Sequence, residues 1–136
     1  MILWATWPGN LKMTILIAAC IGLLVLTTLV HYEALRLLSV GLPRLPVPPR
    51  MRLIGVVLGG FAAHMLQIVL TALAIIALVR WAGLGTLGGG ANPGWATAMY
   101  FSAEIVTSLG YGDVLPDGPL RPLAGVEALK GWLLIG

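Results

Sequence analysis

Two long apolar runs constrain this chain more than any other feature. Met13–Val30 and Leu53–Val79 contain no Asp, Glu, Lys or Arg, and a helix needs about 20 such residues to cross the hydrocarbon of a bilayer. Only 10% of the residues are charged and 59% are hydrophobic, whereas a soluble domain carries roughly 25% charged residues. We therefore expect an all-α membrane protein, and the composition excludes intrinsic disorder and a disulfide scaffold.

The first run is expected to form an N-terminal transmembrane helix within residues 1–31. Lys12 precedes the run, as in a secretory signal peptide, and this is an alternative interpretation. The run is long for a signal peptide, and residues 27–31 hold no small-x-small cleavage site. A membrane anchor is therefore the preferred interpretation.

A basic, proline-rich connector follows at residues 32–52. Four prolines from Pro43 to Pro49 forbid a continuous helix, because proline lacks an amide hydrogen and clashes with the preceding turn. The connector also carries the whole formal net charge of +3, since its charged side chains are Glu33 and four arginines, Arg36, Arg44, Arg50 and Arg52. Such positive charge marks a cytoplasmic loop, whereas a short connector offers no folded basic face for nucleic acid.

The second run predicts an outer helix over residues 53–80. Gly55, Gly59 and Gly60 within it permit the close approach of a neighbouring helix. His64 and Gln67 lie one turn apart at membrane depth, where polar side chains are either functional or hydrogen-bonded to a neighbouring helix. No carboxylate accompanies them in the run, which favours the second interpretation.

A glycine-rich loop is expected over residues 83–94, followed by a short helix over residues 93–107. Asn92 would cap this helix, with Pro93 at its first position. About four turns reach only about 20 Å at 1.5 Å per residue, which is too short to cross the membrane. A short apolar helix followed by Gly-x-Gly predicts a re-entrant segment, which a bilayer tolerates where it lines a watery cavity or lies within protein.

Residues 107–113 read Thr-Ser-Leu-Gly-Tyr-Gly-Asp and come directly after this short helix. Glycines at alternate positions accept backbone angles that other residues avoid, so successive carbonyl groups can point to one side. Such segments, repeated around a symmetry axis, form rings of oxygen that replace part of the hydration shell of a cation. One segment cannot surround an ion, so several identical chains must meet at the axis.

The segment resembles the selectivity filter of potassium-channel pore domains, Thr-Val-Gly-Tyr-Gly-Asp. The resemblance covers residues 53–136 and implies that family's order of elements: an outer helix, a re-entrant pore helix, a selectivity-filter loop and an inner helix, at residues 53–80, 93–107, 108–113 and 122–136. The helix within residues 1–31 is additional to this pattern. The last apolar run is shorter than a full crossing, so the sequence shows only the start of the inner helix.

The resemblance implies that K+ binds to the backbone carbonyls of Ser108, Leu109, Gly110 and Tyr111, with Gly112 completing the ion-binding filter. The Ser108 hydroxyl would close the innermost site. Serine replaces the family's usual threonine there and lacks its stiffening methyl group. Leu109 replaces a β-branched residue whose side chain faces away from the pore, which would alter packing more than ion binding.

The resemblance also implies residues that support the filter. Thr107 precedes the filter directly, and Glu104 stands where some bacterial channels carry a glutamate that is hydrogen-bonded to the filter aspartate, here Asp113. Tyr100 matches the position of an aromatic donor to the same aspartate. We expect these side chains to brace the filter and to set its inactivation. The alternative places Glu104 in water near the outer vestibule.

Three residues of the inner helix need separate interpretation. Gly131 matches the family's hinge glycine, although glycine is also common where helices merely pack. Lys130 departs from the family pattern, because the matching position is ordinarily apolar. Glu127 lies three residues earlier on the same face and could pair with it. The sequence leaves open whether Lys130 faces the pore cavity, the lipid or Glu127.

Together these observations predict a homotetrameric, potassium-selective channel in a bacterial inner membrane, with the 32–52 connector in the cytoplasm and the filter mouth outside. The alternatives are a weakly selective cation channel and a non-conducting scaffold or assembly subunit. The expected partners are further copies of the chain and membrane lipids, without nucleic acid, a small-molecule substrate or a cofactor; K+ is the transported ion. The sequence contains neither His-Glu-x-x-His nor Gly-x-Ser-x-Gly, so an enzyme is not expected.

Overall fold

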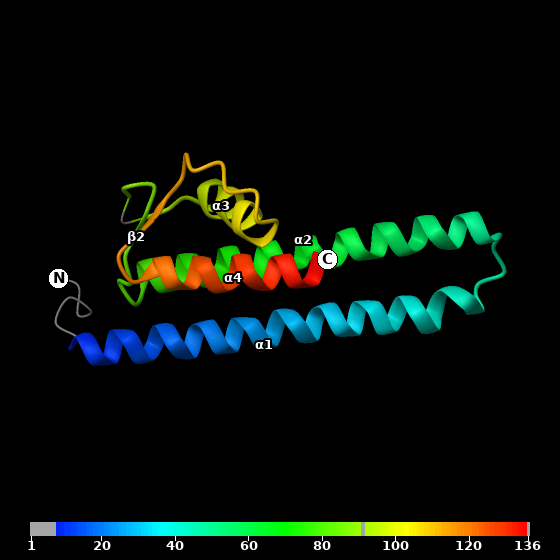
Figure 1. The fold of residues 1–136 in the computed structure, drawn as a ribbon, viewed down its shortest axis with the longest axis horizontal. Coiled ribbons are helices and arrows are strands. Elements are labelled where there is room, and N and C mark those ends of the chain that lie inside the picture. Colours follow the sequence, from blue (N-terminus) through cyan, green and yellow to red (C-terminus); the bar gives the residue numbers. More distant parts are fainter. Residues whose placement is uncertain (1–7, 91, 136) are drawn as a thin grey trace.

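Four α-helices dominate the computed structural model, which describes residues 8–90 and 92–135 (Figure 1). They are α1 (Gly9–Gly41), α2 (Pro49–Arg80), α3 (Trp95–Val106) and α4 (Leu120–Ile135). A 3-10 turn at Leu42–Arg44 follows α1, and two short strands, β1 (Thr86–Leu87) and β2 (Pro116–Asp117), lie on either side of α3 in the sequence.

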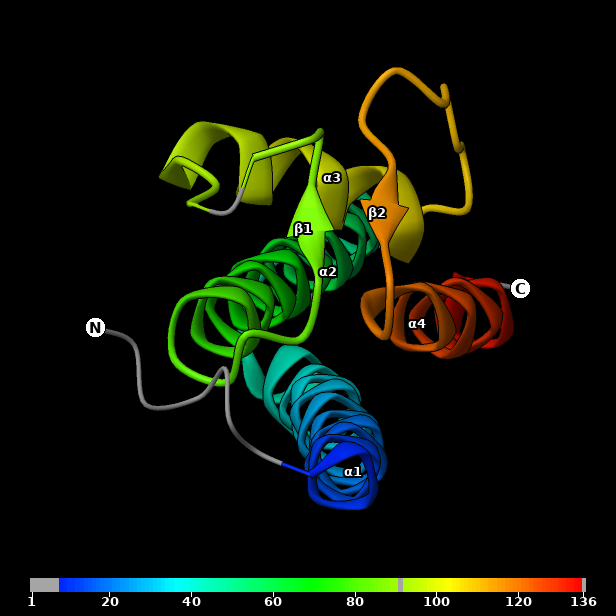
Figure 2. The same ribbon diagram turned by 90° about the vertical axis from the view of Figure 1, so that its left-hand side faces the viewer.

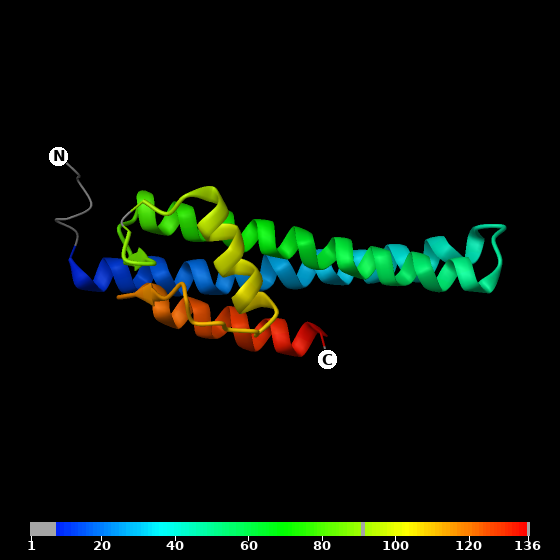
Figure 3. The same ribbon diagram turned by 90° about the horizontal axis from the view of Figure 1, so that it is seen from above.

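The helices α1 and α2 form a long antiparallel hairpin, and both are long and apolar enough to cross a membrane. Helices α3 and α4 pack against the half of this hairpin that is farther from the connector (Figures 1 and 3). The view along the hairpin shows α1, α2 and α4 as neighbouring cylinders, with α3 across one side (Figure 2). The chain is an all-α membrane protein, as the sequence predicts.

The connector between the two long helices is shorter than predicted. Helix α1 continues to Gly41, ten residues beyond the predicted end at residue 31, because no proline occurs between its start at Gly9 and Pro43. Helix α2 begins at Pro49, where the missing proline N–H costs nothing because the first turn leaves its N–H groups unpaired. Only residues 42–48 of the predicted 32–52 connector therefore join the helices. Residues 1–7 of the predicted N-terminal segment lie outside the described residues.

Glycine and polar side chains hold α1 against α2. A Cβ atom on Gly55 would come within 2.6 Å of the Leu42 side chain, and one on Gly59 would overlap Leu38, which confirms the close approach expected at these two positions. At Gly60 the prediction is wrong, because an added Cβ would meet nothing within 4 Å. The Gln67 amide lies 3.1 Å from Nδ1 of His31, across the hairpin. Gln67 therefore bonds to a neighbouring helix, as the sequence favoured.

A small β-ladder ties the loop before α3 to the segment after it. The strands β1 and β2 pair antiparallel, with Thr86 opposite Asp117. Strands of two residues carry no periodicity, so the sequence did not predict them. The start of α3 also differs from the prediction, because Gly94 occupies the capping position and makes no side-chain cap. Asn92 therefore does not cap the helix.

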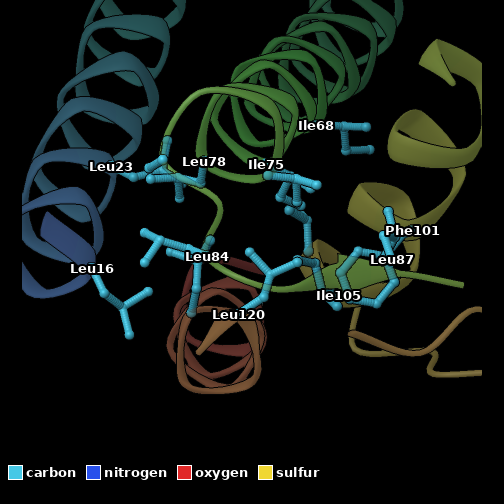
Figure 4. Close-up of a cluster of buried hydrophobic side chains, with 14 residues drawn as sticks. Leu16, Leu23, Ile68, Ile75, Leu78, Leu84, Leu87, Phe101, Ile105 and Leu120 are labelled. Atoms are coloured by element: carbon cyan, nitrogen blue, oxygen red, sulfur yellow. The ribbon is translucent and has the colours of Figure 1, made fainter. Parts of the chain in front are cut away.

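Apolar side chains from all four helices and from the loop meet in one buried core (Figure 4). Its members include Leu16, Leu23, Ile68, Ile75, Leu78, Leu84, Leu87, Phe101, Ile105 and Leu120. Lipid tails are as apolar as these side chains, so close packing rather than escape from water stabilises the contacts within the membrane. This core fixes α3 relative to α2 and α4.

Candidate functional site

The segment 108–113 begins as the cap of α3. The Ser108 N–H donates to the Ile105 carbonyl at 3.1 Å, and the Leu109 N–H donates to the Glu104 carbonyl at 3.0 Å. These two bonds form a Schellman motif, in which the residue after the C-cap is left-handed and is usually glycine. Ser108 takes that role with φ of 58°, at a cost of roughly 1–2 kcal/mol for a residue with a Cβ.

Left-handed residues then recur at alternate positions. Gly110 and Gly112 have φ values of 57° and 79° and, with Ser108, are left-handed, whereas the intervening Leu109 and Tyr111 are not. Alternation of left-handed residues with residues that are not left-handed rotates each peptide plane relative to the preceding one. Successive carbonyl oxygens can therefore point to the same side of the backbone. The backbone thus has the alternation that the glycine spacing predicted, with Ser108 as an additional member.

The N–H groups of this segment point back toward α3. Those of Leu109 and Tyr111 both donate to Glu104 at 3.0 Å, the first to its backbone carbonyl and the second to its carboxylate Oε1. In a trans peptide the preceding carbonyl points opposite to the N–H, and the described residues contain no cis peptide. The carbonyl oxygens of Ser108 and Gly110 therefore point away from α3.

The opposite side of the segment is uncovered in a single chain. The side chains of Leu109 and Tyr111 are 63% and 71% exposed. Within the described residues, no hydrogen bond ends on a carbonyl oxygen of residues 108–112. Exposed apolar side chains beside carbonyl oxygens without donors indicate a surface that other groups complete.

Glu104 lies in the protein interior and not in water. Its side chain is only 4% exposed, so the alternative position at the outer vestibule is wrong. Its predicted partner is also corrected, because the carboxylate accepts the Tyr111 N–H and no hydrogen bond to Asp113 is seen. The chain reverses after Thr107, which brings the Tyr111 backbone over the turn of α3 that carries Glu104.

Tyr100 and Asp113 meet as the resemblance implied. The phenol lies 3.0 Å from each carboxylate oxygen of Asp113, to which it donates, and Asp113 Oδ1 also accepts the Val114 N–H at 3.1 Å. Partial burial, followed by the hydrogen bond and the negative charge of Asp113, raises the pKa of Tyr100 to about 12. The phenol is therefore a protonated donor at neutral pH.

Two hydroxyl groups flank the start of the segment. Ser108 Oγ donates to the carbonyl of Ala128 in α4 at 2.9 Å. Its hydroxyl hydrogen therefore points toward α4, and the lone pairs of its oxygen remain available as acceptors. Thr107 Oγ1 instead donates to the Ala103 carbonyl of its own helix at 2.6 Å. Ser108 thus links the segment to α4, a contact that the sequence did not predict.

The two charges of α4 pair with each other inside the protein. Lys130 forms an ion pair with Glu127, and their side chains are 3% and 0% exposed. Of the three positions that the sequence left open for Lys130, the structure shows the one beside Glu127. Two further residues that the sequence analysis missed complete the cluster: the Thr71 hydroxyl donates to Glu127 at 3.1 Å, and the Thr27 hydroxyl accepts from Lys130 at 3.0 Å.

Gly131 is a position of close packing. A Cβ atom there would overlap the carbonyl of Val106 at the end of α3, so only glycine lets α4 lie this close. The structure favours the packing interpretation over the hinge interpretation. No sequence signal distinguishes the two, because both require glycine.

A family model described as "Ion channel" matches residues 53–136, more than half of the chain. No curated protein and no solved structure matches the sequence in the corresponding comparisons. The matched residues include α2, α3, the segment 108–113 and α4, which form an outer helix, a re-entrant pore helix, a pore loop and an inner helix. The chain therefore belongs to the ion-channel family of two membrane helices and one pore loop, with α1 as an additional helix.

Proposed function

We propose that this ion channel is potassium-selective and homotetrameric, with four copies of residues 108–112 around one axis. The observation that carries the proposal is the direction of the filter backbone. N–H groups of the filter donate to Glu104, which directs the carbonyls of Ser108 and Gly110 away from the pore helix. Stacked rings of such oxygens can replace the hydration shell of K+.

The bare side of the filter supports an assembly of identical chains. One filter strand contributes one oxygen to each ring, so the remaining oxygens must come from symmetry-related copies. The exposed face of α4 also carries apolar side chains, with Leu129 and Trp132 60% and 67% exposed. Some of this surface would meet neighbouring subunits and the rest would meet lipid.

The fold also supports an orientation in the membrane, which we propose to be a bacterial inner membrane. Four of the basic residues, Arg36, Arg44, Arg50 and Arg52, lie in or beside the connector. The connector is at one end of the α1–α2 hairpin, and the filter lies toward the other end (Figure 1). Positive loops remain in the cytoplasm, so the filter mouth would open outside. Arg44 and Arg50 near the connector would then face the headgroups of the inner leaflet.

The experiment is a K+ flux assay on purified protein in liposomes. We expect a flux that Ba2+ blocks, and we expect Gly110→Ala to abolish it, because alanine at φ of 57° distorts the filter. Gly125→Ala is the control, since Gly125 lies in α4 with nothing within 4 Å of an added Cβ. Liposomes without flux would favour the non-conducting scaffold instead.

A further inference from the structure

One turn of the inner helix contacts every other helix and the filter. Residues 127–131 of α4 meet α2 through Thr71, the filter through Ser108, α1 through Thr27 and the pore helix through Val106. Four separate parts of the chain therefore converge on about five residues of one helix, little more than one turn at about 3.6 residues each. A displacement of this turn cannot leave the filter base unchanged.

The contact between this turn and α1 is specific and fully buried. Lys130 Nζ donates to Thr27 Oγ1 at 3.0 Å, and Thr27 is 0% exposed. The Thr27 hydroxyl gives its own proton to the Leu23 carbonyl at 2.6 Å. This bond orients the oxygen, so that a lone pair faces the ammonium group.

The same ammonium group neutralises the only buried carboxylate of α4. Glu127 Oε2 accepts from both Lys130 and Thr71, whereas Glu127 Oε1 is buried and makes no hydrogen bond among the described residues. An uncompensated charge at this depth would be costly. Lys130 is therefore held between Glu127 on its own helix and Thr27 on α1.

From these contacts we propose that α1 takes part in the gating of the channel and is not only a membrane anchor. The contact from Thr27 to Lys130 couples α1 to the Ala128 carbonyl, which holds Ser108 at the base of the filter. A change in the position of α1 would then alter how long the filter conducts. This proposal rests on ion conduction by the chain, but not on its selectivity for K+.

The first test compares two substitutions in adjacent residues of α1. Thr27→Val removes the oxygen that faces Lys130 and keeps the shape of the side chain. Thr28→Val makes the same change one residue later, on the exposed face. In single-channel recordings, we expect Thr27→Val to change the ratio of open to closed time by about threefold or more, and Thr28→Val to leave it unchanged. Single-channel recording samples only folded channels, so loss of stability alone does not change this ratio.

A second comparison tests whether the effect passes through Lys130. The double variant Glu127→Gln and Lys130→Met removes both charges of the pair. Each new side chain is similar in size and shape to the one that it replaces. Adding Thr27→Val to this background should have no further effect on the open-to-closed ratio. An equally large effect in this background would overturn the proposed route.

Hydrogen exchange gives a readout that needs no conduction. We expect Thr27→Val to speed amide exchange in peptides that cover residues 104–113, where the filter N–H groups bond to Glu104, and Thr28→Val to leave it unchanged. If wild-type channels pass no ions, the proposed function fails while this measurement still decides the coupling. Equal exchange in the two valine variants would overturn the proposal.

Discussion

Glu104 accepts hydrogen bonds from two N–H groups of the filter. Its backbone carbonyl accepts the Leu109 N–H and its carboxylate accepts the Tyr111 N–H, each at 3.0 Å. The resemblance placed this glutamate beside the filter but assigned it to Asp113. Sequence position shows that Glu104 is near, yet it does not show which way the peptide N–H groups point. The resemblance assigned Tyr100 to Asp113, and the structure shows that pair.

Two substitutions of Glu104 separate its hydrogen bond from its charge. Glu104→Gln keeps a side-chain oxygen for the Tyr111 N–H, and Glu104→Ala leaves that N–H without an acceptor. A lost partner for a buried polar group costs about 1–3 kcal/mol, and about 1.4 kcal/mol is a tenfold change. We therefore expect the alanine variant to inactivate about tenfold faster and the glutamine variant to resemble the wild type. Macroscopic currents measure this, and equal rates in both variants would contradict the role of the hydrogen bond.

Tyr100 predicts a pH dependence at the alkaline end. Its pKa is raised from 10.0 to about 12, so its contribution to stability is complete below pH 10 and is lost as pH rises through about 12. We expect Tyr100→Phe to lower the unfolding temperature by a constant amount from pH 6 to pH 9. The difference from the wild type should shrink as pH approaches 12. A difference that varies with pH in the neutral range would mean that another group titrates there.

At the scale of elements, the helices were largely predictable and their exact ends were not. Apolar runs and prolines place α1, α2 and α3 near their observed positions. The end of α1 at Gly41 was missed because His31, Glu33 and Arg36 suggested a loop, whereas a helix can project beyond the hydrocarbon. The ladder of β1 and β2 depends on contacts between residues about 30 apart and has no local pattern. Close packing of α4 on α3 through Gly131 likewise depends on which face of each helix is turned inward.

Substitution of two glycines in α4 tests that packing. Gly131→Ala forces α4 away from the Val106 carbonyl, and overpacking of this kind costs about 1–3 kcal/mol. Gly125→Ala meets nothing within 4 Å and should raise stability by up to about 1 kcal/mol, because alanine favours the helix. Thermal unfolding in detergent measures both variants. If the two unfolded at the same temperature, close packing at Gly131 would not be important.

At the scale of the whole molecule, the proposed pore requires several copies of the chain. The filter carbonyls face an uncovered side, and the basic connector and the filter lie toward opposite ends of one hairpin (Figure 1). The sequence predicted both features from the glycine spacing and from the positions of the arginines. It could not predict that Thr27 meets Lys130, because residues 103 positions apart are brought together only by the packing of α1 against α4.

The central claim is that the filter selects K+, and a bi-ionic reversal potential tests it most directly. With K+ inside and Na+ outside at equal concentrations, a selective channel reverses at a negative inside potential, and tenfold selectivity corresponds to a reversal potential of about −59 mV. We predict a value more negative than this, because rings of carbonyl oxygen replace the hydration shell of K+. A reversal potential near zero would contradict the account and identify a weakly selective cation channel.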